Sequence, residues 1–356
     1  MSSNLPTTTK QWSVEGYEGP LSLKYTEAPI PELQDNEVLV QIRGASLNPR
    51  DLIITKGKYP WTVKPSVIPG SDGAGTILAV GKSANRFKPG DNVITTLNQQ
   101  HISGPITEKI AQFGTGASID GVFRQFGVFD ERGLVGMPAG LSFVEAAMLS
   151  CAGVTAWNAL FGGNGGRKVG RGEWVLTQGT GGVSLFAVQF AKSVGARVIA
   201  TTSSAEKVSM LKSLGAEHVI NYCETPNWGP VAKQLTGGVG VDLVVDVAGP
   251  STLRESAESL KLDGQISVVG FIGGEGGEGS REMPSLLETW LNLYTARGIW
   301  VGSRVQMEEM CRAIAADPTG LRPVVNERVF KLHELREAYE YLAEGRNQGK
   351  IGIEID

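Results

Sequence analysis

The stretch WVLTQGTGGVSLFAVQFAKSVGARVIATTSS, residues 174–204, decides the fold that this sequence predicts. It opens with a short apolar strand candidate, turns through Gly179, Gly181 and Gly182, and continues with apolar residues at helical spacing. In such a unit the glycines let the backbone approach a pyrophosphate, and the new helix offers it free N–H groups. The stretch therefore predicts a dinucleotide site in a βαβ unit.

Two positions depart from the usual dinucleotide pattern. Ser184 stands at the third glycine position, where it adds one small side chain between helix and strand. The second strand ends in Thr202, Ser203 and Ser204, with no acid to bind the ribose of NAD, and Lys207 follows on the first turn of the next helix. Hydroxyls and an ammonium can donate to a 2′-phosphate, so the pattern favours NADP(H) over NAD(H). The alternative is an ordinary polar strand end beside a solvated lysine.

Length and composition indicate a globular protein of two domains, since 356 residues are too many for one ordinary core. A net charge of −4 provides no basic excess for nucleic acid. The first residues lack the apolar core of a signal peptide and no 18 apolar residues run together, so we expect a cytoplasmic protein. Cys151, Cys223 and Cys311 lie far apart, which fits a reducing compartment rather than a disulfide framework.

The hydrophobic pattern divides the chain into three regions and predicts an α/β fold. Residues 1–155 hold short strand candidates punctuated by glycine, with a polar stretch at 97–120 that we expect to be a surface loop. Residues 156–302 alternate strands and helices, as a doubly wound parallel sheet requires. Residues 303–356 hold an amphipathic helix and the strand KIGIEI, which we expect to return to the first region because a single strand cannot stand alone. The strand candidates of the second region are Trp174–Gln178, Arg197–Thr202, His218–Tyr222, Asp242–Val247, Gln265–Gly270 and Gly298–Val301.

Several further motifs follow one another in the order of a known family. They are LNPRD (47–51), PGSDGAG (69–75), KPGD (88–91), CAGVTAW (151–157), LGAEHVINY (214–222) and GKI (349–351). Together with the glycine turn they resemble the medium-chain dehydrogenase/reductase superfamily over nearly the whole chain. The resemblance implies a GroES-like, strand-rich catalytic domain and a Rossmann domain. Within the superfamily the chain is similar to the zinc-free quinone oxidoreductase and enoyl reductase branch, and to "zinc-type alcohol dehydrogenase-like" proteins.

The resemblance also implies cofactor contacts. In the reductase branch a serine, a lysine three residues later and a tyrosine fifteen after that bind the 2′-phosphate, and Ser204, Lys207 and Tyr222 repeat that spacing. We therefore expect NADPH as cofactor. Thr155 matches a threonine that meets the nicotinamide, and Lys350 matches a family contact near the cofactor. The other predicted cofactor contacts lie in the glycine turn or at strand ends: Gly179, Thr180, Gly181, Gly182, Val183, Ser203, Val247, Ala248, Phe271 and Ile272. The glycine-rich stretch 273–282 is expected to be a loop by the cleft, or a stretch without function.

The positions that bind zinc in zinc-dependent members hold poor ligands here. The matching residues are Asn48, Ser71 with Asp72, and Cys151. Catalytic zinc needs three ligands of nitrogen, sulfur or carboxylate type, and an asparagine and a serine do not supply them. Residues 97–120 contain no cysteine for a structural zinc. We therefore expect no metal, and interpret Cys151 as a small buried residue near the domain junction, with a reactive thiol as the alternative.

Other groups must then stabilise the negative charge that a hydride brings to its acceptor. Addition to the C=C bond of an enone or quinone spreads that charge over an enolate, for which hydrogen-bond donors suffice. Asn48 and Tyr59 match an asparagine and a tyrosine that face the nicotinamide and substrate in the reductase branch, although Ile53 replaces a further tyrosine of some relatives. We predict Asn48 and Tyr59 as the catalytic residues, with solvent or another side chain as proton donor. The alternative for Tyr59 is a surface aromatic, and Arg50 and Asp51 are expected to form a structural pair.

Four functions fit these residues. The first is an NADPH-dependent reductase of an activated alkene, such as an enone, enal or quinone. The second acts directly on an aldehyde, ketone or alcohol and needs a protein proton donor in place of zinc. The third is a non-enzymatic NADPH-binding protein, and the fourth is a tailoring enzyme of secondary metabolism with a large substrate.

The stretch ARGIWVG, residues 296–302, is the expected last Rossmann strand, at the sheet edge. An uncovered apolar edge favours pairing with another chain, and relatives pair this strand across a two-fold axis. We therefore predict a homodimer that binds a small-molecule substrate and neither nucleic acid nor membrane.

Overall fold

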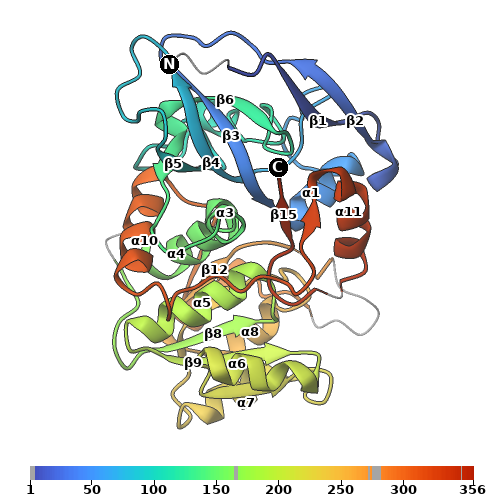
Figure 1. The fold of residues 1–356 in the computed structure, drawn as a ribbon. Coiled ribbons are helices and arrows are strands. Elements are labelled where there is room, and N and C mark those ends of the chain that lie inside the picture. The colour runs from blue at the N-terminus through green and yellow to red at the C-terminus, as the bar shows by residue number, and fades with distance from the viewer. Residues whose placement is uncertain (1–4, 164–166, 272, 275–281, 346) are drawn as a thin grey trace. The chain divides into compact units, whose positions relative to one another are not determined.

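The computed structural model describes residues 5–163, 167–271, 273–274, 282–345 and 347–356 (Figure 1). The chain divides into two compact units. Unit 1 comprises residues 1–154 and 303–356, and unit 2 comprises residues 155–302. Each unit has its own sheet and its own hydrophobic core.

Unit 2 is built on a six-stranded parallel sheet. Its strands are β8 (Trp174–Gln178), β9 (Arg197–Thr202), β10 (His218–Asn221), β11 (Val241–Asp246), β12 (Leu260–Val268) and β13 (Thr295–Gly298), in the spatial order β10-β9-β8-β11-β12-β13. The helices are α4 (Val154–Phe161), which begins at the unit boundary, α5 (Gly182–Ser193), α6 (Val208–Leu214), α7 (Trp228–Leu235), α8 (Leu253–Ser259) and α9 (Leu286–Leu291). Because β8 and β11 are neighbours, the strand order reverses between them, and doubly wound sheets bind ligands at such a switch point. The predicted α/β class is confirmed.

The last strand of unit 2 lies three residues earlier than predicted. β13 ends at Gly298, whereas the sequence favoured Gly298–Val301. Ile299 and Val301 are buried, as their apolar character suggested, but Val301 has a φ of 53°, so the chain has left the extended conformation there. Ile299 N still donates to Val268 O of β12 at 2.8 Å, so the pairing ends gradually beyond Gly298.

Unit 1 is dominated by a mixed seven-stranded sheet. Its path runs β14 (Phe330–Lys331), β15 (Gly352–Glu354), β3 (Glu37–Ser46), β4 (Asp72–Val80), β5 (Asn92–Thr95) and β7 (Leu134–Gly136), with β6 (Phe126–Asp130) paired to β3; β1 (Thr8–Val14) and β2 (Leu23–Pro29) form a separate hairpin. The helices are α1 (Pro49–Thr55), α2 (Glu108–Ala111), α3 (Phe143–Ala147), α10 (Arg304–Ala316) and α11 (Leu335–Ala343). Leu335, Ala338 and Tyr339 of α11 are buried in the core, so α11 is an amphipathic helix of the kind expected in residues 303–356.

Strand register in unit 1 brings three distant segments together. β15 pairs antiparallel with β3 through Gly352 and Ser46, and β3 pairs antiparallel with β4 through Ser46 and Asp72. Figure 1 shows the C-terminal strand in red beside the blue β3. The residue just before β15, the end of β3 and the start of β4 therefore meet at one place in the sheet.

The polar stretch at 97–120 is a surface loop only in part: residues 103–109 are exposed, whereas residues 97–99 and 114–117 are buried. Leu97, Asn98 and Gln99 are all buried. The amides of Asn98 and Gln99 donate to backbone carbonyls, at 2.7 Å to Ile110 O and 3.0 Å to Gly133 O respectively. An irregular segment can be buried when side chains satisfy its backbone groups in this way, and composition does not reveal it.

One run of helix, Phe143–Phe161, has the length and composition that could cross a membrane, with a mean hydropathy of 1.2. Of its most apolar window, 78% is buried inside the structure. Core helices of water-soluble proteins pass the same test, so this run is weak evidence for a span.

Candidate functional site

A buried polar cluster lies where β15, β3 and β4 meet in unit 1. The Lys350 ammonium donates to Asn48 Oδ1 at 2.6 Å and lies 2.9 Å from Asp72 Oδ2. Asp72 Oδ1 accepts from Ser71 Oγ at 2.8 Å, and Ser71 Oγ accepts from Asn48 Nδ2 at 3.3 Å. No member of this ring of four side chains is more than 5% exposed. A buried ion pair is tolerated only with such additional hydrogen bonds.

Local sequence explains how the cluster is presented. Asn48 stands at the N-cap of α1, Pro49 supplies a helical φ at the first position, and Asp51 Oδ2 accepts from Asn48 N at 2.8 Å. Gly70 has a φ of 89° and turns the chain sharply just before Ser71. A side chain at residue 70 would also collide with the ring of Phe123.

Tyr59 is linked to the cluster through Arg50. Arg50 Nε donates to Tyr59 Oη at 3.3 Å, and the guanidinium lies over the tyrosine ring, 5.0 Å from its centre. Arg50 Nη1 also lies 3.7 Å from Asp51 Oδ1, and the other carboxylate oxygen of Asp51 accepts from Asn48 N. The ion pair expected between Arg50 and Asp51 is present, and it connects the two predicted catalytic residues, Asn48 and Tyr59.

The residues at the zinc positions do not suit a divalent metal. Asn48 Oδ1 and Asp72 Oδ2 already face the Lys350 ammonium, which would repel a second cation placed there. Cys151, in a π-helical turn over Leu149–Gly153, is partly exposed as a residue, but burial raises the pKa of its thiol to about 12, so the thiolate that zinc prefers is disfavoured. Within the described ranges, no three His, Cys, Asp or Glu side chains are grouped to hold a metal.

The glycine turn of unit 2 follows β8 directly. Gly179 has a φ of 74°, and its N–H donates to Thr201 O at 2.8 Å. Gly181 is the N-cap of α5, so Gly182 and Val183 lie in the first turn of the helix, where backbone N–H groups are free for an anion. Thr180 is buried between them and β8. All five residues predicted here, Gly179, Thr180, Gly181, Gly182 and Val183, therefore lie in one βα turn.

Ser184 has a definite role in place of the third glycine. It is 1% exposed, and its Oγ donates to Gln178 O at 2.6 Å. The hydroxyl ties the first turn of α5 to the last residue of β8. The substitution thus adds a bond at the helix–strand contact and leaves the N-terminal N–H groups of α5 unaffected.

The residues predicted to bind a 2′-phosphate come together at the ends of β9 and β10. Ser203 and Ser204 directly follow β9, Lys207 closes a 3₁₀ turn over Ala205–Lys207, and Tyr222 N donates to Thr202 O at 3.0 Å. Tyr222 is exposed. Among residues that the structure describes, no hydrogen bond or ion pair occupies the Lys207 ammonium or the hydroxyls of Ser203, Ser204 and Tyr222.

The switch point carries a buried network that the sequence did not reveal. Gln178 Oε1 accepts from the backbone N–H groups of Val247 and Ala248, at 3.1 and 3.2 Å. Gln178 Nε2 donates to Asp246 Oδ2 at 2.9 Å, and Asp246 is fully buried. The network fixes the backbone that follows β11. Its only sequence signal is a polar residue at the end of each of two buried strands, Gln178 and Asp246.

The other predicted cofactor contacts are distributed over unit 2. Val247 and Ala248 are half-buried beyond β11, Phe271 is 50% exposed beyond β12, and Thr155 is buried at the start of α4. Ile272 and most of the stretch 273–282 lie outside the described residues. Lys350, the last predicted contact, belongs to the buried cluster of unit 1.

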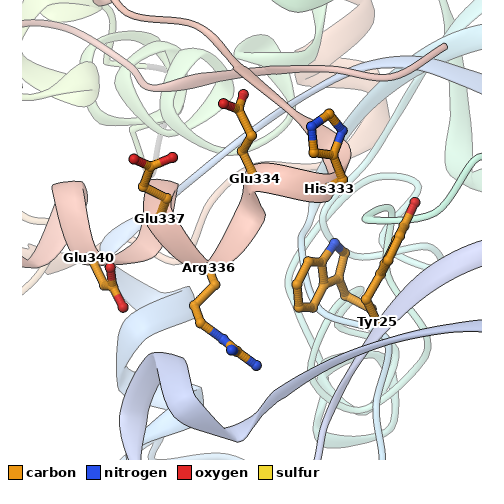
Figure 2. Close-up of a pocket in the computed structure, with 7 residues that line it drawn as sticks. Tyr25, His333, Glu334, Arg336, Glu337 and Glu340 are labelled. Carbon is orange, nitrogen blue, oxygen red and sulfur yellow. The ribbon is translucent and has the colours of Figure 1, made fainter.

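A surface depression of about 590 Å³ is a separate feature. It lies beside α11 and β2 and is lined by His333, Arg336 and three glutamates, among others (Figure 2). Figure 2 shows Arg336 and Glu337 pointing away from each other. Arg336 donates to Leu23 O at 2.6 Å, and Glu337 pairs with Arg328 at 3.0 Å. These charges are satisfied locally and do not converge on a ligand.

Comparisons with known proteins agree with this arrangement. The family described as "Alcohol dehydrogenase GroES-like domain" matches residues 34–139, and "Zinc-binding dehydrogenase" matches residues 182–316. The chain is 43% identical over 336 residues to a zinc-type alcohol dehydrogenase-like protein of Schizosaccharomyces pombe, covering 94% of this chain and 95% of the relative.

Solved structures give the same result. A structure described as an alcohol dehydrogenase from Sinorhizobium meliloti is similar with a TM-score of 0.87 and 34% identity, covering 98% of this chain and 99% of that one. The quinone oxidoreductase of Coxiella burnetii is similar with a TM-score of 0.77 and 25% identity, covering 98% and 100%.

Unit 2 has a glycine turn at the switch point of a parallel sheet, and unit 1 is strand-rich and carries the polar cluster. These two features together are typical of a dinucleotide-dependent oxidoreductase. The chain belongs to the medium-chain dehydrogenase/reductase superfamily, as an alcohol dehydrogenase-like oxidoreductase. Dehydrogenases of this superfamily bind a nicotinamide cofactor.

Asp51 gives the unit a pH dependence of known sign. Burial raises the pKa of its carboxyl to about 6, against the lowering effect of Arg50 and of the Asn48 N–H. The folded state therefore binds the Asp51 proton more tightly than the unfolded state. The protonated carboxyl adds its full contribution to the free energy of unfolding below about pH 4, and this contribution is lost as the pH rises through 6. Each unit of pKa difference is worth about 1.4 kcal/mol. Asp51→Asn keeps the acceptor and removes the titration, so we expect its melting temperature to rise relative to wild type between pH 4.5 and 7.5, by about 2–4 °C per kcal/mol.

Asp130 provides a control of opposite sign. Burial raises the pKa of its carboxyl, but hydrogen bonds from Arg132 outweigh burial and lower it overall. The stability that this ion pair adds is present above about pH 4 and is lost as the pH falls further, so Asp130→Asn should lose more stability at about pH 5 than at about pH 2.5. A melting-temperature difference for Asp51→Asn that does not change with pH would contradict the argument.

Proposed function

We propose that this protein is a zinc-independent, NADPH-dependent reductase that transfers hydride to the activated C=C bond of an enone, enal or quinone. The observation that carries the proposal is the buried ring of Asn48, Ser71, Asp72 and Lys350. At the positions where zinc-dependent relatives hold their metal, this chain has an ammonium bound by an amide and a carboxylate. A carbonyl reduced directly to an alkoxide calls for a Lewis acid, whereas an enolate can be stabilised by hydrogen-bond donors.

The proposed reaction needs few protein groups. When bound, NADPH supplies the hydride to the β-carbon of the substrate. The π electrons of the C=C bond move toward the carbonyl, and Asn48 Nδ2 donates to the oxygen that gains the charge. We assign Tyr59, whose hydroxyl accepts a hydrogen bond from Arg50, to positioning the acceptor. Solvent then protonates the α-carbon, which gives the saturated carbonyl product.

The preference for NADPH is supported by the ends of β9 and β10. Ser203, Ser204, Lys207 and Tyr222 gather there with uncommitted polar groups, and no acid follows β9 directly. An ammonium and hydroxyls favour the phosphate of NADPH, whereas NADH brings a ribose hydroxyl that an acid would bind.

A homodimer is supported by the surface near β13. β13 is an edge strand, and α9 exposes nearly all its apolar side chains, including Leu286, Leu287 and Trp290 at 88%, 62% and 69%. Monomers rarely expose a patch of this kind, and an isologous interface would cover it on both subunits. We propose a second copy of this chain as the partner.

Direct reduction of an aldehyde or ketone is the second candidate, favoured by the alcohol dehydrogenase names of several relatives. The two functions give different products from one substrate. With EDTA-treated protein, NADPH and a medium-chain 2-alkenal, we expect the saturated aldehyde, identified by mass spectrometry, at a rate that EDTA does not change. An allylic alcohol would establish carbonyl reduction instead.

Lys207→Ala tests the cofactor preference. Loss of a charge-assisted hydrogen bond of about 1.5–3 kcal/mol should weaken NADPH binding roughly 10- to 100-fold and leave NADH binding unchanged. Fluorescence titration with both cofactors measures this. Lys212→Ala, an exposed lysine further along α6, is the matched control. Equal losses for both cofactors would argue against a phosphate contact.

The mass in solution tests the dimer. Light scattering at micromolar concentration should give twice the chain mass of 37.9 kDa. Leu287→Glu combined with Trp290→Glu should shift the protein to monomer, whereas Val239→Glu, an exposed apolar residue outside α9 and β13, should not. A monomeric wild-type protein would remove the proposal.

A further inference from the structure

The ring in unit 1 fixes which way the Asn48 carboxamide points. A lysine ammonium has donors and no acceptor, so only the oxygen of the amide can face Lys350. The nitrogen then faces Ser71, whose hydroxyl hydrogen is directed to Asp72 Oδ1. In the opposite orientation the amide N–H groups would meet the ammonium, donor against donor. Lys350 therefore determines the orientation of Asn48.

Lys350 has no donor left for a ligand. Its three N–H groups are directed to Leu47 O at 2.7 Å, Asn48 Oδ1 at 2.6 Å and Asp72 Oδ2 at 2.9 Å. A hydrogen bond to a cofactor would have to replace one of these contacts, in a site where Lys350 is 4% exposed. The geometry thus disfavours the cofactor contact that family resemblance suggested for this residue.

Asn48 retains one donor. Of the two N–H groups on Nδ2, one is directed to Ser71 Oγ, and the described part of the chain offers the other no hydrogen-bond partner. Ser71 and Asp72 are fully buried, whereas Asn48 keeps 5% exposure. The ring therefore has one uncommitted N–H group, on its most exposed member.

We propose that Lys350 is a positioning residue for Asn48. Its ammonium, held by Asp72, holds the carboxamide with the nitrogen directed away from the lysine, so that the free N–H is preoriented toward the substrate oxygen. The role of Asn48 toward substrate rests on the proposed function, but the orientation of its amide does not. A preoriented donor stabilises developing charge without reorganisation during the reaction.

A double-mutant cycle tests this mechanism. Lys350→Met and Asn48→Ala should each lower kcat for 2-alkenal reduction on the order of 10²-fold, as removal of one such donor does. The double variant should be no slower than Asn48→Ala, because Lys350 acts through Asn48. The dissociation constant of NADPH should stay within about twofold of wild type. If the kcat losses of the two single variants multiply in the double variant, the proposal fails. It also fails if Lys350→Met weakens NADPH binding.

Two further variants separate positioning from folding. Lys350→Met leaves Asp72 buried without its partner, so Lys350→Met with Asp72→Asn removes both charges and should fold while remaining slow. Lys331→Met, an exposed lysine paired with Glu354, is the matched control and should keep wild-type kcat. If the charge-neutral double variant recovers wild-type kcat, the ring serves stability alone and the proposal fails.

Neutron crystal structures, which distinguish the nitrogen of the Asn48 carboxamide from its oxygen, provide a readout independent of the substrate. The Asn48 side chain should adopt one conformer in the wild-type protein and a turned or multiple conformer in the charge-neutral double variant. An unchanged single conformer would overturn the positioning role. If wild-type protein makes no saturated aldehyde, the proposed function fails, and this comparison still decides the role of Lys350.

Discussion

A buried ammonium and carboxylate are stable only when every donor and acceptor is satisfied, and unit 1 is arranged to meet that condition for Lys350 and Asp72. The ammonium has three acceptors, and Asp72 Oδ2 accepts from Ser46 Oγ at 2.7 Å in addition. Strand register supplies these groups, because β15, β3 and β4 are neighbours. The pairing of these strands thus brings the residues of the polar cluster together.

Under the proposed function, the same arrangement gives a fold that is similar to zinc-binding dehydrogenases a chemistry that needs no metal. A metal centre and a buried ammonium both place positive charge among oxygen ligands, but they offer a substrate different contacts. A metal ion can coordinate a substrate oxygen directly. An ammonium whose three N–H groups are already hydrogen-bonded can influence a substrate only through the residues that it contacts. In this chain the neighbour with a free donor is Asn48.

Unit 2 likewise holds its backbone in place with buried hydrogen bonds. The glycine turn leaves backbone N–H groups of α5 free, and Ser184 holds that helix to β8. Gln178 and Asp246 stabilise the neighbouring strand end at the switch point. Rigid backbone around a ligand site lowers the cost of ordering on binding, which is the advantage of building such sites on strand ends.

Sequence alone determined the α/β class, the glycine turn with the helix that follows it, and most strands of unit 2, because periodicity and turn chemistry act over a few residues. It misplaced β13, where buried apolar residues follow the strand. It also missed that Asn98 and Gln99 help to bury the start of the stretch 97–120, of which only the middle is the expected surface loop. Only the tertiary structure decided the surroundings of Lys350. That residue lies 302 positions from Asn48, and no local pattern specifies which acceptors will surround a lysine once distant strands have paired.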